Sequence, residues 1–381
     1  MRITFVITGL GMGGAEVQVC TLAAGLTARG ARVNIISMLP ERAAHPQLAD
    51  GSISVSTLGM KRGRWSPGDL LRYVKLVRAW RPDIVHAQMF HANVLARAGR
   101  PFLNVPLVCT AQNIVEGPEY AKTARLRIRV RELVYRLTDP LSAVTTQVSS
   151  EGARRYVRVG AVPASKMLFV PNAIDCERYR PDPQMRRAAR EELHLGDQFA
   201  WICVGRMEEQ KDPWTLLRAF QIAAKQMASC VLLLVGAGSL EAAVRGYAAE
   251  LGIASRVRFL GRRSDVAQLL NAADGYVLSS KHEGLSMAAL EAAASALPVV
   301  ATSAGAEAVL AEESGWVVPT CNAEALAERL CGLMALPAEK RRSMGEAGRR
   351  FVSATYALPA VLDRWEAIYQ KLVRRTGSAA T

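Results

Sequence analysis

Two cations in the second half of the chain follow directly on a strand-like apolar run. The run Ala200–Val204 ends at Gly205, and Arg206 and Lys211 come in the turn after it. If this run is a strand of a parallel sheet, both cations stand at its carboxyl edge, where ligands of such sheets bind. A planar guanidinium fork beside a point charge suits a diphosphate. Solvated surface charges are the alternative interpretation.

Two glutamates form the second candidate group. Glu283 precedes an expected helix that opens at Gly284 and Ser286, where free N–H groups could also meet an anion. Glu291 lies about two turns into this helix, which is apolar nearly all round. A carboxylate there needs a partner, and hydroxyls of a hexose and of a ribose could supply one for each glutamate. An ordinary helix with two surface glutamates explains the charges but not their apolar surroundings.

A glycine-rich loop joins the first expected strand, Ile3–Thr8, to an expected helix over about Ala15–Arg29. Residues 9–14 match G-x-G-x-x-G, the fingerprint of dinucleotide-binding folds. That function needs an acidic residue at the end of the second strand, and residues 36–40 contain none. We therefore expect neither NAD nor FAD. The loop is either a backbone anion site at a helix N-terminus or simply a tight turn.

Strand-like runs alternate with helical ones along the whole chain, which predicts βαβ units and mostly parallel sheets of the α/β class. The first series of expected strands is Ile3–Thr8, Arg32–Met38, Ile84–Ala87, Leu107–Ala111, Ala143–Val148 and Met167–Val170. The second series is Ala200–Val204, Cys230–Val235, Val257–Leu260, Gly275–Ser279, Pro298–Thr302 and Gly315–Val318. The proline-punctuated segment Pro171–Pro183 between them reads as a linker.

The chain has 381 residues, more than the roughly 250–300 that a single core supports. We expect two doubly wound, Rossmann-like domains that face a central cleft. The first comprises residues 1–178 and the second residues 179–356. The final helix, at about residues 357–375, is expected to cross back to the first domain, with Trp365 and Tyr369 on one face.

With these motifs in place, the sequence resembles glycosyltransferase family 4, the retaining GT-B enzymes that use nucleotide-diphosphate sugars. The most specific element is the pair Glu283 and Glu291, with seven residues between them. The resemblance implies that Arg206 and Lys211 hold the diphosphate. It also implies that Glu283 contacts the donor sugar and that Glu291 binds the ribose. We place Glu283, Arg206 and Lys211 in the catalytic set, with His91 as a further candidate.

The resemblance extends to both halves of the chain. The loop Gly13-Gly14-Ala15-Glu16 is similar to the family's acceptor-side glycine loop. The resemblance implies that the first domain binds the acceptor and that the second binds the nucleotide sugar. Asp274 and the stretch Thr302–Glu307 also fit the pattern. The predicted substrate-binding and donor-binding set beyond the four residues above is Gly13, Gly14, Glu16, Gln112, Asn113, Asn172, Gly205, Arg262, Gly284, Leu285, Ser286 and Glu291.

The first domain departs from the family pattern. Ser/Thr-x-His-Asn is expected after its fourth strand, and the chain has Thr110-Ala111-Gln112-Asn113, so Gln112 stands where the family has a histidine. Ala173 replaces a glycine of the pattern. His86 and His91 remain nearby, and a histidine at a strand end is more often structural than catalytic.

The resemblance implies a retaining, metal-independent hexosyltransferase. The acceptor hydroxyl would attack from the leaving-group side and a phosphate oxygen would take its proton, so that no histidine base is needed. The sequence contains no Asp-x-Asp motif, which argues against a metal clamp. We expect no cofactor, with the nucleotide-diphosphate sugar as co-substrate.

The net charge of +14 is concentrated in the first half of the chain. Residues 1–180 hold 25 Lys and Arg against 12 Asp and Glu, and the remaining residues hold 23 against 22. The segment Lys122–Arg136 has six cations and one carboxylate, and Lys61–Trp65 adds more positive charge. Apolar residues recur in the first segment at helical spacing: Leu126, Val130, Leu133 and Val134. This is either a solvated helix face or a surface for anionic lipid headgroups or a lipid-linked diphosphate.

These observations predict transfer of a sugar to a polyprenyl-diphosphate-linked or glycan acceptor in cell-surface or exopolysaccharide assembly. No run reaches the ~20 apolar residues of a membrane span, no signal peptide is recognisable, and the seven scattered cysteines read as reduced thiols. We therefore expect a cytoplasmic protein, peripheral at the inner membrane face. The alternatives are a sugar-nucleotide epimerase or hydrolase of GT-B fold, and a basic nucleic-acid-binding protein. We expect no nucleic-acid partner, since no recognition motif accompanies the charge.

Overall fold

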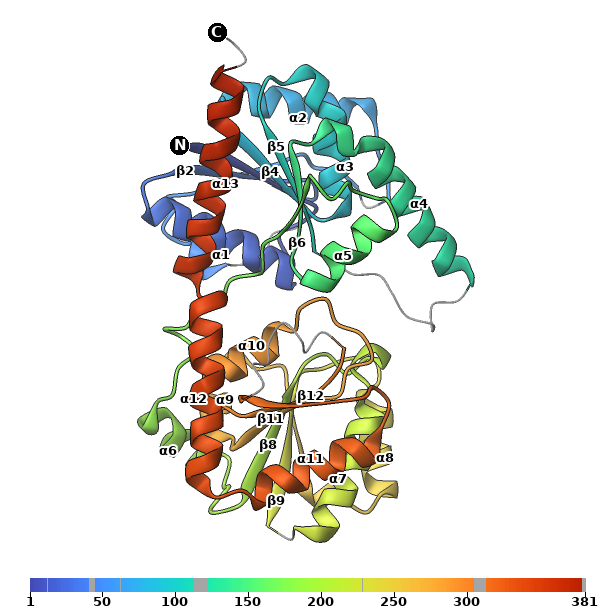
Figure 1. Ribbon diagram of the computed structural model, residues 1–381, viewed down its shortest axis with the longest axis vertical. Coiled ribbons are helices and arrows are strands. Elements are labelled where there is room, and N and C mark those ends of the chain that lie inside the picture. Colours follow the sequence, from blue (N-terminus) through green and yellow to red (C-terminus); the bar gives the residue numbers. More distant parts are fainter. Residues whose placement is uncertain are drawn as a thin grey trace. The chain divides into compact units, whose positions relative to one another are not determined.

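The computed structural model describes residues 1–11, 13–40, 45–61, 63–112, 122–227, 229–304 and 313–378. The chain divides into two compact units, each built on its own sheet (Figure 1). Unit 1 comprises Met1–Ala173 and Leu358–Thr381, and unit 2 comprises Ile174–Ala357. The assignment of acceptor binding to the first and of donor binding to the second stays a prediction.

Unit 1 contains a seven-stranded parallel sheet in the order β3-β2-β1-β4-β5-β6-β7. Its strands are β1 (Arg2–Ile7), β2 (Arg32–Ser37), β3 (Ser54–Thr57), β4 (Ile84–Gln88), β5 (Leu107–Ala111), β6 (Val144–Gln147) and β7 (Met167–Phe169). The strand order changes direction between β1 and β4. In such sheets the crevice at the carboxyl ends of the two strands flanking this point is the usual ligand site.

Helices cover both faces of this sheet. They are α1 (Gly14–Ala28), α2 (Pro67–Trp80), α3 (Phe90–Gly99), α4 (Lys122–Thr138), α5 (Ser150–Arg158) and, from the chain's end, α13 (Leu358–Ser378). Phe5 of β1 packs in one core with α1 and α13, whereas its neighbour Val6 packs in another with α2 and α3. Adjacent strand residues point to opposite faces, so a continuously apolar strand such as β1 is buried on both sides.

The edge strand β3 was not predicted. Its sequence, Ser54-Val55-Ser56-Thr57, contains one apolar residue, and it pairs only with β2. It therefore lacks the apolar run by which the other strands were recognised. As a result, the strand before Gln112 is the fifth of its sheet, not the fourth.

The last helix, α13, returns to unit 1 and packs against α1. Trp365 and Tyr369 are buried in the core that α1 and β1 form. Arg29, just after α1, pairs with Asp363 at 2.6 Å and with Glu366 at 2.8 Å. The predicted return of the final helix is thus confirmed.

Unit 2 contains a six-stranded parallel sheet in the order β10-β9-β8-β11-β12-β13. Its strands are β8 (Phe199–Val204), β9 (Cys230–Val235), β10 (Val257–Gly261), β11 (Gly275–Leu278), β12 (Val299–Thr302) and β13 (Gly315–Val318). Its helices are α6 (Pro183–Glu192), α7 (Pro213–Gln226), α8 (Glu241–Glu250), α9 (Val266–Ala272), α10 (Met287–Ala294), α11 (Ala323–Ala335) and α12 (Ala338–Thr355). The order changes direction between β8 and β11, which places the switch point where Arg206 and Glu283 follow.

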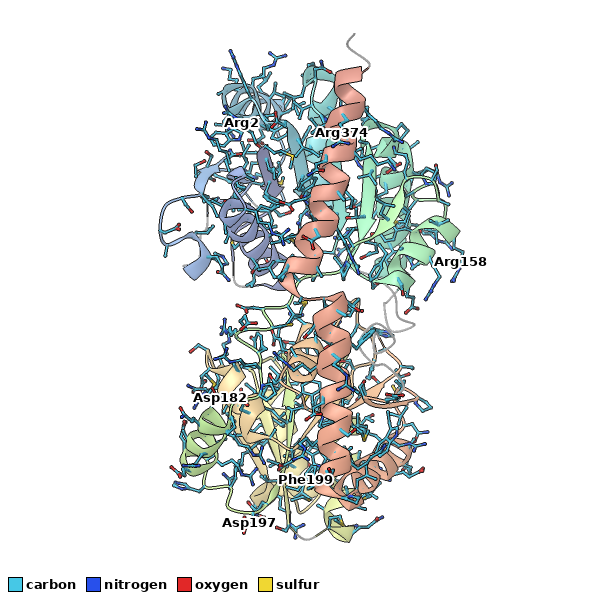
Figure 2. The ribbon with its side chains drawn as sticks, turned by 60° about the vertical axis from the view of Figure 1, so that its left-hand side comes forward. Arg2, Arg158, Asp182, Asp197, Phe199 and Arg374 are labelled. Carbon is cyan, nitrogen blue, oxygen red and sulfur yellow. The ribbon has the colours of Figure 1, made fainter. Side chains whose placement is uncertain are left out.

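Local sequence fixes where the helices of unit 2 begin. Asp182 caps α6 (Figure 2) by accepting hydrogen bonds from the backbone N–H groups of Gln184 and Met185 at 2.9 and 3.0 Å. Pro183 follows at the first helical position, where a missing N–H costs nothing. The two parallel Rossmann-like sheets confirm the predicted fold class. Within the described residues, no helix combines the length and the apolar character that crossing a bilayer requires.

Candidate active site

The turn after β8 is held at the carboxyl edge of unit 2's sheet by backbone contacts. The Gly205 N–H donates to the Val235 carbonyl at 2.9 Å, so the turns after β8 and β9 lie side by side. Gly236 has φ +129°, and a Cβ there would collide with the Gly205 carbonyl. Glycine at 236 is therefore required for this close approach. Arg206, the residue after Gly205, is exposed at the sheet edge.

Lys211 and Glu283 come together although they lie far apart in the sequence. The Lys211 ammonium forms an ion pair with a Glu283 carboxylate oxygen, to which the Ser280 hydroxyl also donates at 2.8 Å. The stem of Lys211 lies across Gly205. The cation and the carboxylate that the sequence assigned to a diphosphate and a sugar thus occupy one small region.

A set of hydrogen bonds keeps this region rigid. The Ser279 hydroxyl donates to the Lys211 carbonyl at 2.8 Å, and the Lys281 N–H donates to the Gln210 carbonyl at 2.9 Å. From β12, the Thr302 hydroxyl donates to the Ser280 carbonyl at 2.6 Å. The turn after β8 and the loop after β11 are therefore cross-linked, which pre-organises the charged pair.

The loop that follows Glu283 leads into α10. Ser286 caps this helix, because its hydroxyl accepts a hydrogen bond from the Ala289 N–H at 3.4 Å. Of the two residues between Glu283 and Ser286, Gly284 is half-buried and Leu285 is buried. Glu283 therefore precedes the capped N-terminus of α10, and anion binding by the N–H groups there stays a prediction.

Glu291, inside α10, has a partner that the sequence did not reveal. Burial raises the pKa of Glu291 to about 7, against a hydrogen bond from the Tyr179 hydroxyl and the charge of Arg178, which both lower it. The segment that carries Tyr179 is held by Arg349 of α12, whose guanidinium donates to the Tyr179 carbonyl at 2.9 Å. The carboxylate expected to need a partner thus has a tyrosine from the start of unit 2.

Two other residues of the second half lie at opposite edges of the sheet. Asp274 precedes β11 at the amino edge, where it accepts from the Arg186 side chain at 2.6 Å and from the Ala200 N–H at 2.8 Å. Its contacts are those of a structural residue. Arg262 follows β10 at the carboxyl edge and is exposed, on the same edge as Arg206.

In unit 1 the glycine loop shapes the start of α1. Gly13 is the N-cap residue, and a Cβ on it would collide with the Glu16 carboxylate, which folds back over it. Gly14 opens the helix. Glycine at 13 therefore permits the first-turn carboxylate to lie at the helix mouth, where the macrodipole favours it.

Three side-chain amides, each from a different segment of the chain, form a row of hydrogen bonds with Gln112 in the middle. Its amide nitrogen donates to the Gln88 side-chain oxygen at 2.6 Å, and its own oxygen accepts from the Asn172 amide at 3.3 Å. The structure thus brings Gln112 and Asn172 together and adds Gln88, which the sequence reasoning missed. The predicted residue Asn113 lies outside the described residues, as do Gly305, Ala306 and Glu307 of the stretch Thr302–Glu307.

The two candidate histidines have different surroundings. His86 is fully buried, with its ring nitrogens 2.6 Å from the Tyr369 hydroxyl and 2.7 Å from the Thr110 hydroxyl. Burial lowers the pKa of His86 to about 3, so it is a neutral, structural residue. His91 lies in the first turn of α3, where partial burial of its ring and the nearby Arg131 lower its pKa.

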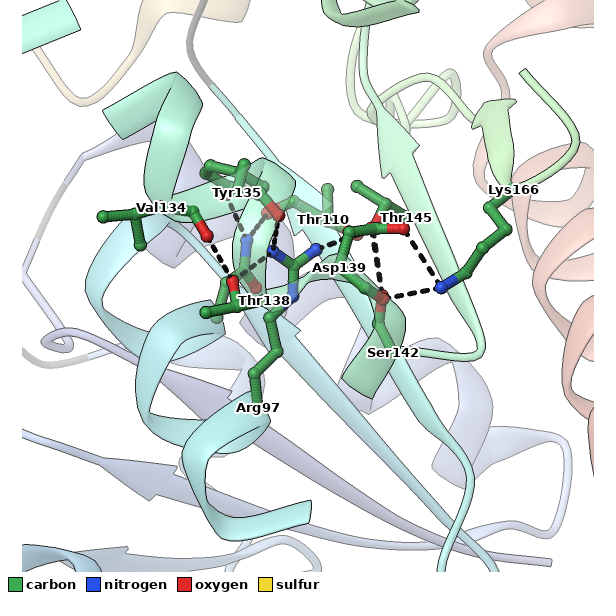
Figure 3. Close-up of polar contacts among 10 residues, drawn as sticks. Arg97, Thr110, Val134, Tyr135, Thr138, Asp139, Ser142, Thr145 and Lys166 are labelled. Carbon is green, nitrogen blue, oxygen red and sulfur yellow. Dashed lines mark hydrogen bonds and ion pairs between the residues drawn. The ribbon is translucent and has the colours of Figure 1, made fainter. Parts of the chain in front are cut away.

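Helix α4 is anchored to unit 1 by a buried polar network on its inner side (Figure 3). The Asn93 amide donates to the Tyr135 hydroxyl at 2.7 Å. The buried guanidinium of Arg97 lies over the Tyr135 ring and pairs with Asp139 at 3.0 Å. Lys166 pairs with the other oxygen of Asp139, also at 3.0 Å. The network fixes the rotation of α4 about its axis.

The outer side of α4 carries an exposed apolar stripe. Its members and their exposed fractions are Leu126 (64%), Val130 (50%), Leu133 (51%) and Leu137 (68%). At about 100° per residue this stripe lies opposite to Tyr135. Among the described residues, no other helix has more than one large exposed apolar side chain. Val134, one of the apolar residues predicted at helical spacing, is half-buried, and the fourth member of the stripe is Leu137.

Two Rossmann-like parallel sheets, with a cationic turn and a glutamate loop at the switch point of the second, define a protein of the GT-B class. The described residues contain no group of three or more His, Cys, Asp or Glu side chains arranged to hold a metal ion. Two family models match the chain: Glycosyltransferase Family 4 over residues 12–178, and Glycosyl transferases group 1 over residues 185–351. The chain belongs to this family of glycosyltransferases.

Individual relatives agree with this assignment. The GDP-mannose-dependent alpha-(1-6)-phosphatidylinositol monomannoside mannosyltransferase of Mycobacterium tuberculosis is 28% identical over 64% of this chain and 63% of its own length. The UDP-Gal:alpha-D-GlcNAc-diphosphoundecaprenol alpha-1,3-galactosyltransferase of Escherichia coli is 27% identical over 61% of each protein. The chain thus spans less than two thirds of the length of these relatives.

The fold has close counterparts among solved structures. The crystal structure of Anabaena HepE in complex with UDP and glucose superposes with a TM-score of 0.82 at 20% identity. The match covers 98% of this chain and 100% of HepE. A fold of two Rossmann-like units therefore recurs at low sequence identity.

Proposed function

We propose that this protein transfers a hexose, with retention of configuration, from a nucleotide-diphosphate sugar to a lipid-linked acceptor. Unit 2 would bind the donor and unit 1 the acceptor. The observation that carries the proposal is the Lys211–Glu283 pair beside the Gly205–Arg206 turn. A diphosphate on this turn would draw Lys211 toward its oxygens and leave Glu283 to accept from sugar hydroxyls.

In the proposed reaction, the bond between the sugar's anomeric carbon and the diphosphate oxygen breaks. A bond from the acceptor oxygen to that carbon forms on the same face, and the acceptor proton passes to the departing diphosphate. Arg206 and Lys211 stabilise the charge that develops on the leaving group. Gln112 supports this route, because a neutral amide is no base near neutral pH and already has both its ends in hydrogen bonds.

The nucleotide part of the donor would be held by Glu291. Its carboxylate, when ionised, can accept hydrogen bonds from both ribose hydroxyls. Because the pKa of Glu291 is about 7, we expect donor affinity to rise as the pH passes upward through that value.

The acceptor is proposed to be a polyprenyl-diphosphate-linked sugar. The E. coli relative is described as acting on a sugar linked to diphosphoundecaprenol, and the mycobacterial one on a phosphatidylinositol mannoside. Both descriptions name a phosphate-bearing lipid. The cationic excess of the first half of this chain suits such an acceptor better than a neutral glycan.

The apolar stripe of α4 is proposed to dock this protein on an anionic membrane surface. Its four exposed apolar side chains are flanked by the exposed cations Arg127, Arg129 and Arg136. An amphipathic helix of this kind lies in the plane of the membrane, with its apolar side in the headgroup region and its cations on anionic lipids. Docking there would bring unit 1 to a lipid-linked substrate.

The test is a transfer assay with the full chain. Thermal-shift screening of UDP-, GDP- and ADP-sugars identifies the donor, and N-acetylglucosaminyl-diphosphoundecaprenol in detergent serves as the first acceptor. We expect Lys211→Ala to lower turnover about 100- to 1,000-fold, while the protein still unfolds cooperatively on heating. Lys225→Ala, an exposed cation on α7, is the matched control. Near-normal turnover of Lys211→Ala would contradict the assignment, and sugar release without any acceptor would indicate a hydrolase instead.

A further inference from the structure

A large cavity opens at the carboxyl edge of unit 1's sheet, on the side of α3 that faces the turns after β1 and β2. Its volume is about 860 Å³, within the roughly 300–1,000 Å³ of small-molecule sites. The glycine loop, the segment after β3 and the first turns of α3 surround it. It therefore lies at the switch point of the sheet, where a ligand is expected.

The walls of this cavity are mainly apolar. Apolar side chains from three separate segments line it: Met38, Leu39, Met60, Phe90, Val94 and Ala98. Water in contact with so much apolar surface is unfavourable, whereas a hydrocarbon chain would fill the space. Unbranched methionines adapt to ligands of irregular shape.

Positive charge gathers at one side of the cavity. The Arg64 N–H donates to the Lys61 carbonyl at 3.1 Å, and Gly63 has φ +72°, so a tight turn sets Lys61 and Arg64 close together. Both side chains are exposed, line the cavity, and form no ion pair within the described part of the chain. Trp65 follows them with 54% of its surface exposed.

Two further polar groups line the same cavity. The Thr8 hydroxyl is shielded from solvent and has no hydrogen-bond partner among residues that the structure describes. Glu16 adds a carboxylate, which is folded back on Gly13. An occupant with a hydrogen-bonding group near its head would pair with the Thr8 hydroxyl. Lys61 and Arg64 would favour an occupant whose head is negatively charged.

We infer that this cavity binds the isoprenoid end of the acceptor, with the attached diphosphate held by Lys61 and Arg64. The inference rests on the proposed function and adds where the lipid is recognised. The first isoprene units leave the membrane and lie between Met60, Phe90 and Ala98, and Trp65 covers them at the entrance. An acyl phosphate has the same combination of anionic head and apolar tail, so the test must separate the two.

The test is isothermal titration calorimetry of the full-length protein with farnesyl diphosphate below its micelle concentration. It is carried out in the Lys211→Ala background, so that diphosphate does not bind at the donor turn. We expect farnesyl diphosphate to bind, and farnesol and inorganic diphosphate each to bind at least tenfold more weakly. The double substitution Lys61→Ala and Arg64→Ala should weaken farnesyl diphosphate about tenfold and leave farnesol unchanged. Lys75→Ala, an exposed cation on α2, should change neither.

Filling the cavity provides the second arm of the test. Ala98→Trp should weaken binding of farnesyl diphosphate at least tenfold. Because a half-buried substitution can disturb folding, Trp65→Ala at the exposed entrance is measured as well, with a several-fold loss expected. Unchanged affinity in both variants, or tight binding of dihexanoyl phosphatidic acid alone, would overturn the inference. Binding of farnesyl diphosphate without any sugar transfer would contradict the proposed function and leave this inference standing.

Discussion

Among the single residues of the candidate site, Glu291 is a carboxyl group with a strongly raised pKa. Its carboxyl group keeps a proton up to about pH 7 in the folded protein, whereas its ordinary pKa is 4.5. Between these values the folded state holds a proton that the unfolded state has lost. The contribution of Glu291 to stability is therefore full below about pH 4.5 and is lost as the pH rises to about 7. If Glu291 binds the ribose as proposed, its ionisation above about pH 7 favours ligand binding at the expense of stability.

The fall in the stability contribution of Glu291 with rising pH leads to a prediction for Glu291→Gln, whose side chain is neutral at every pH. Relative to wild type, the melting temperature of the variant should increase between about pH 4.5 and about pH 7 and then level off, as followed by differential scanning calorimetry. Donor affinity should meanwhile fall about tenfold at pH 8, because a neutral amide is a weaker acceptor than a carboxylate. A constant difference in melting temperature across this range would contradict the raised pKa.

The sequence made the types of the site residues predictable but not their partners. Glu283 and Glu291 could be recognised because their spacing and apolar setting lie within one short segment. Tyr179 and Gln88 could not, because each meets its partner only after distant segments fold together. Gln112 illustrates the difference. Its departure from the family histidine is visible in the sequence, whereas its two amide contacts emerge only in the structure.

At the scale of elements, α4 should decide whether the protein binds membranes. Replacing Val130 and Leu133 with Glu removes half of the exposed stripe and repels anionic headgroups, so binding to phosphatidylglycerol-containing liposomes should fall at least tenfold. Sedimentation with liposomes at low and high salt measures it. Leu71→Glu is the control, since Leu71 is 62% exposed on α2. Equal binding of the variant and the control would rule out α4 as the docking element.

The network beneath α4 gives a second prediction at this scale. Asp139→Ala leaves the buried Arg97 guanidinium without its carboxylate and should lower the free energy of unfolding by about 3–5 kcal/mol. Urea denaturation followed by circular dichroism tests this. As a reference, Glu241→Ala breaks an exposed pair with Arg245 and should cost at most about 1 kcal/mol. A similar small loss in both variants would mean that Asp139 is not an anchor.

Elements with a buried apolar pattern were predicted well, and those without one were not. The central strands of both sheets stand out as apolar runs because they are covered on two faces. The edge strand β3 has only Val55 as an apolar residue and was missed. In α4 the helical spacing included Val134, which is half-buried, and not the exposed Leu137. Only the anchoring of Tyr135 determines that Leu137 faces outward.

At the scale of the whole molecule, elements that lie far apart in the chain pack together. The repeated βαβ pattern predicts two sheets, and the apolar face of the last helix predicts that it must be covered. The core that covers it belongs to unit 1, so residues 358–378 stabilise a sheet that the chain left at residue 173. The sequence could suggest this return through the family resemblance, but periodicity alone does not say which sheet the helix covers.

This packing predicts which unit responds to a change in the last helix. Trp365→Ala opens a cavity in the core shared by α13, α1 and β1 and should cost about 3–5 kcal/mol. Hydrogen exchange read by mass spectrometry should show faster exchange in β1, β2 and α1, whereas peptides from β8 and β9 keep their protection. The measurement is repeated for Trp201→Ala in unit 2's core, where the pattern should reverse. If Trp365→Ala instead loosens β8 and β9, then α13 does not act as part of unit 1.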